Sequence, residues 1–138
     1  MNSVKITIPG RLPGLNEYID ACRAHRMKGA AMKKAAMEQC MWQMAALKRK
    51  GTYFDCCDIT IKFIEKDQRR DKDNISGFGD KVILDALQKM NIIPNDGWRQ
   101  VNNLHNSYGV DKANPRIEVT LTEATENEQS YVIRTLNA

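Results

Sequence analysis

Hydrophobic side chains change their spacing four times along this chain of 138 residues, between the two-residue period of a β-strand and the longer period of an α-helix. Alternation predicts strands over residues 4–8, 59–64 and 116–123, and residues 99–108 also look like a strand. Helical spacing predicts a long helix over 27–50 and a shorter one over 81–90. We therefore expect a single α+β domain over residues 1–138, in the order β-α-β-α-β-β, with two helices and a mixed sheet of about four strands.

Residues that commonly end helices support these limits. Gly51 follows the long helix, and Asn91 and Pro94 follow the shorter one. The methionines of the long helix are interpreted as adaptable core packing. After Thr122 the apolar pattern fades, so roughly the last 15 residues are expected to form a flexible tail or a short helix over 131–136.

Composition argues against several classes of protein. No apolar run approaches the roughly 20 residues that cross a bilayer, and residues 1–10 lack a signal peptide's apolar stretch, so we expect a cytoplasmic protein with no membrane partner. The four cysteines form no CxxC pair and the chain has only two histidines, which disfavours a zinc site and favours free thiols. A net charge of +4 is compatible with a nucleic-acid partner but does not identify one.

Acidic residues gather in the segment between the second strand and the second predicted helix. In an extended segment Asp71 and Asp73 would point to the same side, about 7 Å apart. Carboxylates brought together in a folded site repel each other unless a cation lies between them. Oxygen ligands without a Cys or His cluster favour Mg²⁺, with Mn²⁺ as a substitute.

Two further segments carry charged residues that would complete such a site. Lys81 and Asp85 share one face of the shorter helix, and Asp96 lies in a turn that leads to the next strand. Taken singly, each motif has an ordinary explanation as a surface turn or a solvated charge pair. The combination predicts a metal site at which three segments converge.

Basic residues lie within and beside this acidic segment, and others lie over residues 23–34. They would bind phosphates if the partner is DNA, although such runs are usually solvated. The candidate DNA-binding residues are Arg23, Arg26, Lys33, Lys34, Arg69, Arg70 and Lys72.

The order of these motifs resembles that of the RusA family of Holliday junction resolvases. The residues that carry the resemblance are Asp71-x-Asp73-Asn74, Lys81-x3-Asp85-Ala86-Leu87, Asn95-Asp96-Gly97 and Val101, and the similarity spans about residues 64–122. It implies a dimeric α+β protein with Asp71, Asp73 and Asp96 as essential acids, Lys81 as the essential lysine and Asp85 as a further acid. This chain departs from the family pattern by about one extra helical turn between Asp73 and Lys81, and Asn95 replaces a common acid.

The resemblance implies a Mg²⁺-dependent endonuclease that resolves four-way DNA junctions by paired, symmetric nicks. Asp71, Asp73 and Asp96 would hold one or two Mg²⁺ ions, Lys81 would contact the phosphate, and Asp85 would assist the metal or orient Lys81. A homodimer would match the two-fold symmetry of the junction. The alternative is a non-catalytic module of the same fold that binds branched DNA, and flaps or forks remain open as substrates.

Overall fold

The computed structural model describes residues 2–125 and has three helices and four strands in this part of the chain. In chain order they are β1 Ser3–Pro9, α1 Leu15–Ala24, α2 Arg26–Arg49, β2 Cys57–Glu65, α3 Lys72–Lys89, β3 Val101–Val110 and β4 Arg116–Glu123. The expected α+β class and single domain are confirmed, while the order is β-α-α-β-α-β-β. The prediction for the last residues lies outside the described part.

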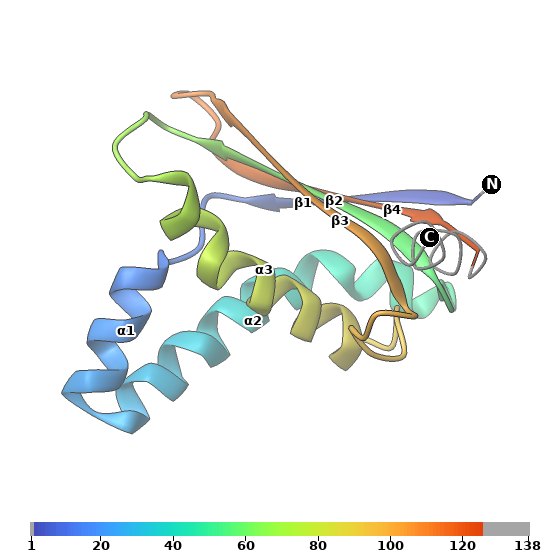
Figure 1. Ribbon diagram of the computed structural model, residues 1–138, viewed down its shortest axis with the longest axis horizontal. Helices are drawn as coiled ribbons and strands as arrows, with labels where there is room; N and C mark the ends of the chain where they lie inside the picture. The colour runs from blue at the N-terminus through green and yellow to red at the C-terminus, as the bar shows by residue number, and fades with distance from the viewer. Residues whose placement is uncertain (1, 126–138) are drawn as a thin grey trace, which may run out of the picture.

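The four strands form one mixed sheet in the order β1-β4-β2-β3. β4 pairs antiparallel with both β1 and β2, whereas β2 and β3 are parallel. A parallel pair needs a crossover, and here α3 supplies it between β2 and β3. The helices cover one face of the sheet (Figure 1).

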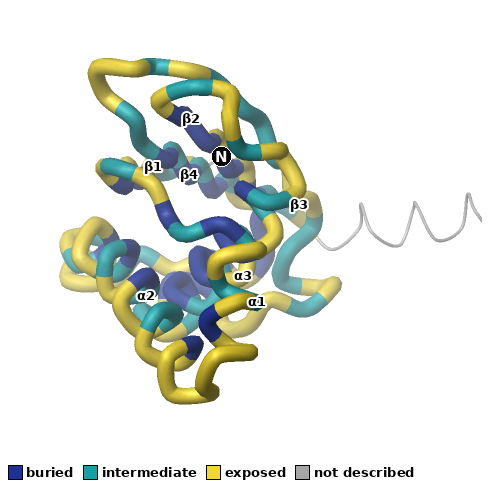
Figure 2. The backbone as a smooth tube through the Cα atoms, turned by 90° about the vertical axis from the view of Figure 1, so that its left-hand side faces the viewer, coloured by how far each residue is buried: buried dark blue, intermediate teal, exposed yellow. Residues whose placement is uncertain are grey.

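The core lies between that face and the helices. Along β2, Ile59, Ile61 and Phe63 are at most 1% exposed, while Thr60 and Lys62 between them are exposed. The helices contribute the buried residues Cys40 and Met44 from α2 and Val82, Ile83 and Leu87 from α3. Figure 2 shows buried segments between the layers and exposed ones around the outside.

The predicted start of the second helix was wrong. α3 begins at Lys72, nine residues before the predicted start at residue 81, and runs through Gly77 and Gly79. Ile75 and Phe78 extend its buried stripe backwards, and Gly79 is needed for close packing, since a Cβ there would lie 2.7 Å from the ring of Phe63. These glycines therefore reflect contact between helix and sheet.

The first helix, α1, was missed by the sequence analysis, so the expected count of two helices was wrong. Ala21 is its only buried residue within the described chain, while Leu15 and Tyr18 are partly buried against the core and Tyr18 stacks on Phe78 of α3 with ring centroids 4.5 Å apart. The start of α1 is stabilised by the Gly14 backbone N–H, which donates to Glu17 Oε1 at 3.3 Å.

Other expectations from the sequence are confirmed, with one exception. Gly51 (φ 74°) and Asn91 (φ 57°) adopt the left-handed conformation after α2 and α3. All four cysteines are free, with only Cys22 exposed. Of the methionines in α2, Met44 is fully buried and Met37 and Met41 pack against the core, whereas Met27 at the start of the helix is 67% exposed, so the core prediction fails there. Within residues 2–125, no helix combines the length and apolar character needed to cross a bilayer.

Candidate functional site

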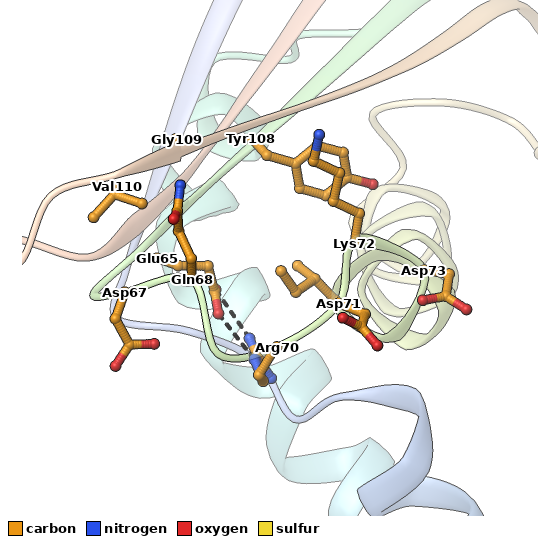
Figure 3. Close-up of a pocket in the computed structure, with 11 residues that line it drawn as sticks. Glu65, Asp67, Gln68, Arg70, Asp71, Lys72, Asp73, Tyr108, Gly109 and Val110 are labelled. Atoms are coloured by element: carbon orange, nitrogen blue, oxygen red, sulfur yellow. Dashed lines mark hydrogen bonds and ion pairs between the residues drawn. The ribbon is translucent and has the colours of Figure 1, made fainter.

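A cavity of about 540 Å³ lies between the loop that follows β2, the start of α3 and the end of β3 (Figure 3). Its lining combines carboxylates, two cations and a small apolar surface. The lining residues are Glu65, Asp67, Gln68, Arg70, Asp71, Lys72, Asp73, Ile75, Tyr108, Gly109 and Val110. Asp71, Asp73, Arg70 and Lys72 are therefore the candidate site residues that one cavity brings together.

One wall of the cavity is fixed by an ion pair between Arg70 and Glu65. Two guanidinium nitrogens of Arg70 donate to the two oxygens of Glu65, each at 2.9 Å, and a third bond runs from Arg70 to the Leu12 carbonyl at 2.9 Å. The side chains are only 12% and 7% exposed. Arg70 was predicted to bind DNA, but its guanidinium is used to tie the end of β2 to the chain before α1.

Asp71 and Asp73 lie at the start of α3, and the predicted extended geometry was wrong for this pair. Asp71 is the extended N-cap residue (φ −69°, ψ 150°), while Lys72 and Asp73 are already helical. The Asp71 carboxylate does not cap the helix, and Asp73 Oδ1 accepts only from the next backbone N–H, at 3.0 Å. Both residues are exposed at the N-terminal end of the helix.

Lys72 brings its charge over the face of Tyr108. Its Nζ lies 5.4 Å from the ring centroid, within range of a cation–π contact. The Tyr108 ring also stacks on Phe63, with centroids 5.9 Å apart and planes 20° apart. This stack connects the cavity wall to the core of the sheet.

Lys81 and Asp85 do not line the cavity. Asp85 is bound by Lys33 of α2 at 2.8 Å and by Lys81 at 3.2 Å. Burial alone would raise the pKa of Asp85, but the hydrogen bonds from Lys33 and Lys81 outweigh it and lower that pKa. Lys81 lies eight residues beyond Asp73, about 12 Å along the helix axis. The cluster therefore connects two helices, and it occupies Lys33, which was predicted to bind DNA.

Asp96 also lies apart from Asp71 and Asp73. It is exposed in the loop after α3, at the opposite end of that helix from the cavity (Figure 1). Among residues 2–125, no group of three or more His, Cys, Asp or Glu side chains is placed to hold a metal ion. Figure 3 shows the Asp71 and Asp73 carboxylates on different sides of the helix start, so each could serve as one of the one or two carboxylates that Mg²⁺ commonly takes from a protein, its shell being completed by water and substrate phosphates.

The remaining predicted DNA-binding residues lie outside the cavity. Arg69 is 87% exposed and lies 3.6 Å from Asp67. Arg23 and Arg26 are exposed at the turn between α1 and α2, and Lys34 is exposed further along α2. Arg23, Arg26 and Lys34 are therefore accessible to a polyanion away from the carboxylates of the cavity.

Sequence reasoning missed several residues that the structure makes notable. Asp80 is half-buried in α3 and accepts a 2.7 Å hydrogen bond from Asn106 of β3, and burial raises its pKa to about 6. It lies seven residues after Asp73, hence on the same helical face. Gln68 and Tyr108 complete the cavity. The sequence shows that Asp80 shares a face with Asp73 only if the helix is already known to start at Lys72.

No protein-family model matches the chain, and no curated protein matches it significantly. The interpretation of the site therefore rests on its own residues and geometry.

Proposed function

We propose that this protein is a Mg²⁺-dependent endonuclease that resolves four-way DNA junctions by paired, symmetric nicks, acting in the cytoplasm as a homodimer. The observation that supports it is the pair of exposed carboxylates, Asp71 and Asp73, beside Lys72 at the mouth of a cavity. The RusA-like order of the motifs around this pair adds support. The net charge of +4 suits a DNA partner.

Asp71 and Asp73 would hold the ion, which when bound supplies an activated water and stabilises charge on the phosphate. Lys72 is the flexible cation nearest to both carboxylates in sequence and lines the same cavity, so it is better placed than Lys81 to contact the scissile phosphate. Arg70 holds the wall and keeps the loop before α3 in position. Lys81 and Asp85 would stabilise the packing of α3 on α2, together with Lys33, and so support the site.

Asp96 can join this ligand set only from a second copy of the chain, because the length of α3 separates it from Asp71 and Asp73 within one chain. Mixing Asp73→Asn protein with Asp96→Asn protein tests this. If one site combines residues of two protomers, each variant alone is inactive and the mixed dimer regains one intact site, which produces single nicks. If the mixture stays inactive, the acids do not combine across protomers.

The main experiment incubates a labelled four-way junction and a matched linear duplex with the protein, in Mg²⁺ or in EDTA. We expect paired nicks in the junction alone, only with Mg²⁺, and at least a 100-fold slower reaction for Asp73→Asn, an order of magnitude typical of lost transition-state charge stabilisation. Asp20→Asn is the matched control, since Asp20 is exposed on α1 away from the cavity.

The alternative function is non-catalytic binding of branched DNA. The exposed Arg23, Arg26 and Lys34 on α1 and α2 would suffice for it without any metal. Junction binding without cleavage in either Mg²⁺ or Mn²⁺ would establish this alternative and refute the nuclease. Cleavage of flaps or forks in preference to the junction would change the substrate and keep the chemistry.

A further inference from the structure

We propose that the cavity beside Asp71 and Asp73 takes up one unstacked DNA base, which stacks on Tyr108 and hydrogen-bonds with Gln68. This inference rests on the proposed function, because it names the part of the DNA that the same site accepts. It concerns recognition of the substrate and does not depend on the metal chemistry.

The size and walls of the cavity suit a single planar ring. Its volume of about 540 Å³ falls within the range of small-ligand sites. Figure 3 shows Gln68 on one side and Tyr108 with Lys72 on the opposite side. Tyr108 and Val110 share one face of β3, and Val110 is 53% exposed. Together with Ile75 they give the cavity an apolar surface at its polar mouth.

Tyr108 has one aromatic neighbour in the core and one replaceable contact in the cavity. Phe63 packs on the ring from the core, so the ring is already ordered before a ligand arrives. The other contact is the ammonium of Lys72, an exposed side chain held only by a weak cation–π attraction. A base can therefore replace Lys72 on the ring, and Lys72 then becomes free to reach the adjoining phosphate.

The charges of the lining favour a base over a phosphate inside the cavity. Four carboxylates line the cavity against two cations: Arg70 neutralises Glu65, and Lys72 offsets one of Asp67, Asp71 and Asp73, so the lining stays negative until a metal ion binds. A phosphate placed there would be repelled, but an uncharged base would not. The amide of Gln68 offers both a donor and an acceptor to a base edge. Bases at a branch point are the cheapest to unstack because their stacking is already interrupted.

The test measures binding of four-way junctions that carry one abasic site at successive positions around the branch point, with Ca²⁺ in place of Mg²⁺ to prevent cleavage. Wild type is compared with Tyr108→Leu, Tyr108→Phe and Gln68→Ala. Gln43→Ala is the matched control, because Gln43 is exposed on α2. Circular dichroism checks that Tyr108→Leu is folded, while Gln68 is exposed and its replacement leaves the core intact.

At one position the abasic site should weaken wild-type binding by about 5- to 150-fold, the usual value of one base–aromatic stack. Tyr108→Leu should weaken binding of the intact junction similarly and show no abasic effect, while Tyr108→Phe and Gln43→Ala should match wild type. Gln68→Ala should weaken binding of the intact junction by about 2- to 12-fold, and this loss should disappear when the abasic site occupies that position. The inference is overturned if no position matters to wild type, or if Tyr108→Leu and Gln68→Ala keep the full abasic effect. Both outcomes are measured by DNA binding in Ca²⁺, so they are distinct from failure of the nuclease proposal, which is tested by cleavage in Mg²⁺.

Discussion

Replacing Glu65 by Gln tests whether the Arg70–Glu65 ion pair holds the loop before α3. The two side chains are 7% and 12% exposed and are joined by two bonds of 2.9 Å. Losing one charge leaves the Arg70 guanidinium mostly buried and unpaired, which typically costs 3–5 kcal/mol. Arg70 keeps its bond to the Leu12 carbonyl and lies 3.8 Å from Glu17, so we expect the lower end, about 3 kcal/mol. The melting temperature should fall by roughly 10 °C for a chain of this size.

Urea unfolding of four proteins measures this value and separates the pair from its parts. Wild type, Glu65→Gln, Arg70→Met and the double variant form a cycle in which the double variant should be more stable than either single one. Glu118→Gln is the matched control. Glu118 accepts from Arg116 at 2.9 Å, but the two side chains are 18% and 25% exposed and Arg116 keeps a second carboxylate, Asp111, at 3.0 Å, so the loss should cost less than about 1 kcal/mol. Additive effects of the two single changes would refute the argument, because they would mean that neither charge depends on the other.

Three further predictions follow from individual contacts. Burial raises the pKa of Asp80 to about 6 from an ordinary 3.8, so the free energy of unfolding should decline as the pH rises through that interval. Asp80→Asn should remove this decline and increase the free energy of unfolding by up to about 1 kcal/mol at neutral pH, measured by urea unfolding. Gly79→Ala should cost about 1–3 kcal/mol in the same assay, because its Cβ would lie 2.7 Å from Phe63; an unchanged midpoint would contradict that contact. In the junction assay Lys72→Ala should slow cleavage by at least 10-fold and Lys81→Ala by much less, and the reverse order would restore Lys81 as the phosphate ligand.

Hydrophobic period predicted the sheet well because it is set by burial on one face. The strand over 116–123 matches β4 in both bounds, and β1 and β2 extend their predictions by one or two residues. The parallel pairing of β2 and β3 was not predicted. Alternation shows which face of a strand is buried but carries no information on its neighbour or direction.

The two errors in the helices have different origins. In α3, Gly77 and Gly79 lie in the part of the helix that was not predicted, and both lie where a side chain would meet another element: a Cβ at Gly77 would be 2.9 Å from Leu15. A single sequence cannot separate a glycine chosen for its φ from one chosen for its small volume. In α1, Leu15, Tyr18, Ile19 and Cys22 do follow helical spacing, so the sequence held a signal, which was overlooked in a helix of only ten residues next to Pro13 and Gly14.

The candidate site was predicted in part. Asp71, Asp73 and Lys72 were named from the sequence and do line one cavity, whereas Asp96 and Lys81 do not. The order of these residues in the sequence does not predict their distances. A continuous helix from Lys72 to Lys89 separates Asp96 from Asp71 and Asp73, whereas a short loop in its place would have brought them together. No sequence pattern pointed to Tyr108 or Gln68, because their places in the cavity depend on which strand end faces the start of α3.

The location of the cavity follows from the one parallel connection in the sheet. In a β-α-β unit, the strands end on the same edge and the helix between them begins there, so backbone amides and the positive helix end face a common crevice. Here β2 ends at Glu65, β3 ends at Val110 and α3 begins at Lys72, all around the same cavity. Asp71 and Asp73 lie at this edge, where charged ligands are favoured, and Asp96 lies at the opposite edge, just before β3 begins. If all three acids serve one reaction, the same geometry that brings the first two together requires the third to come from another chain.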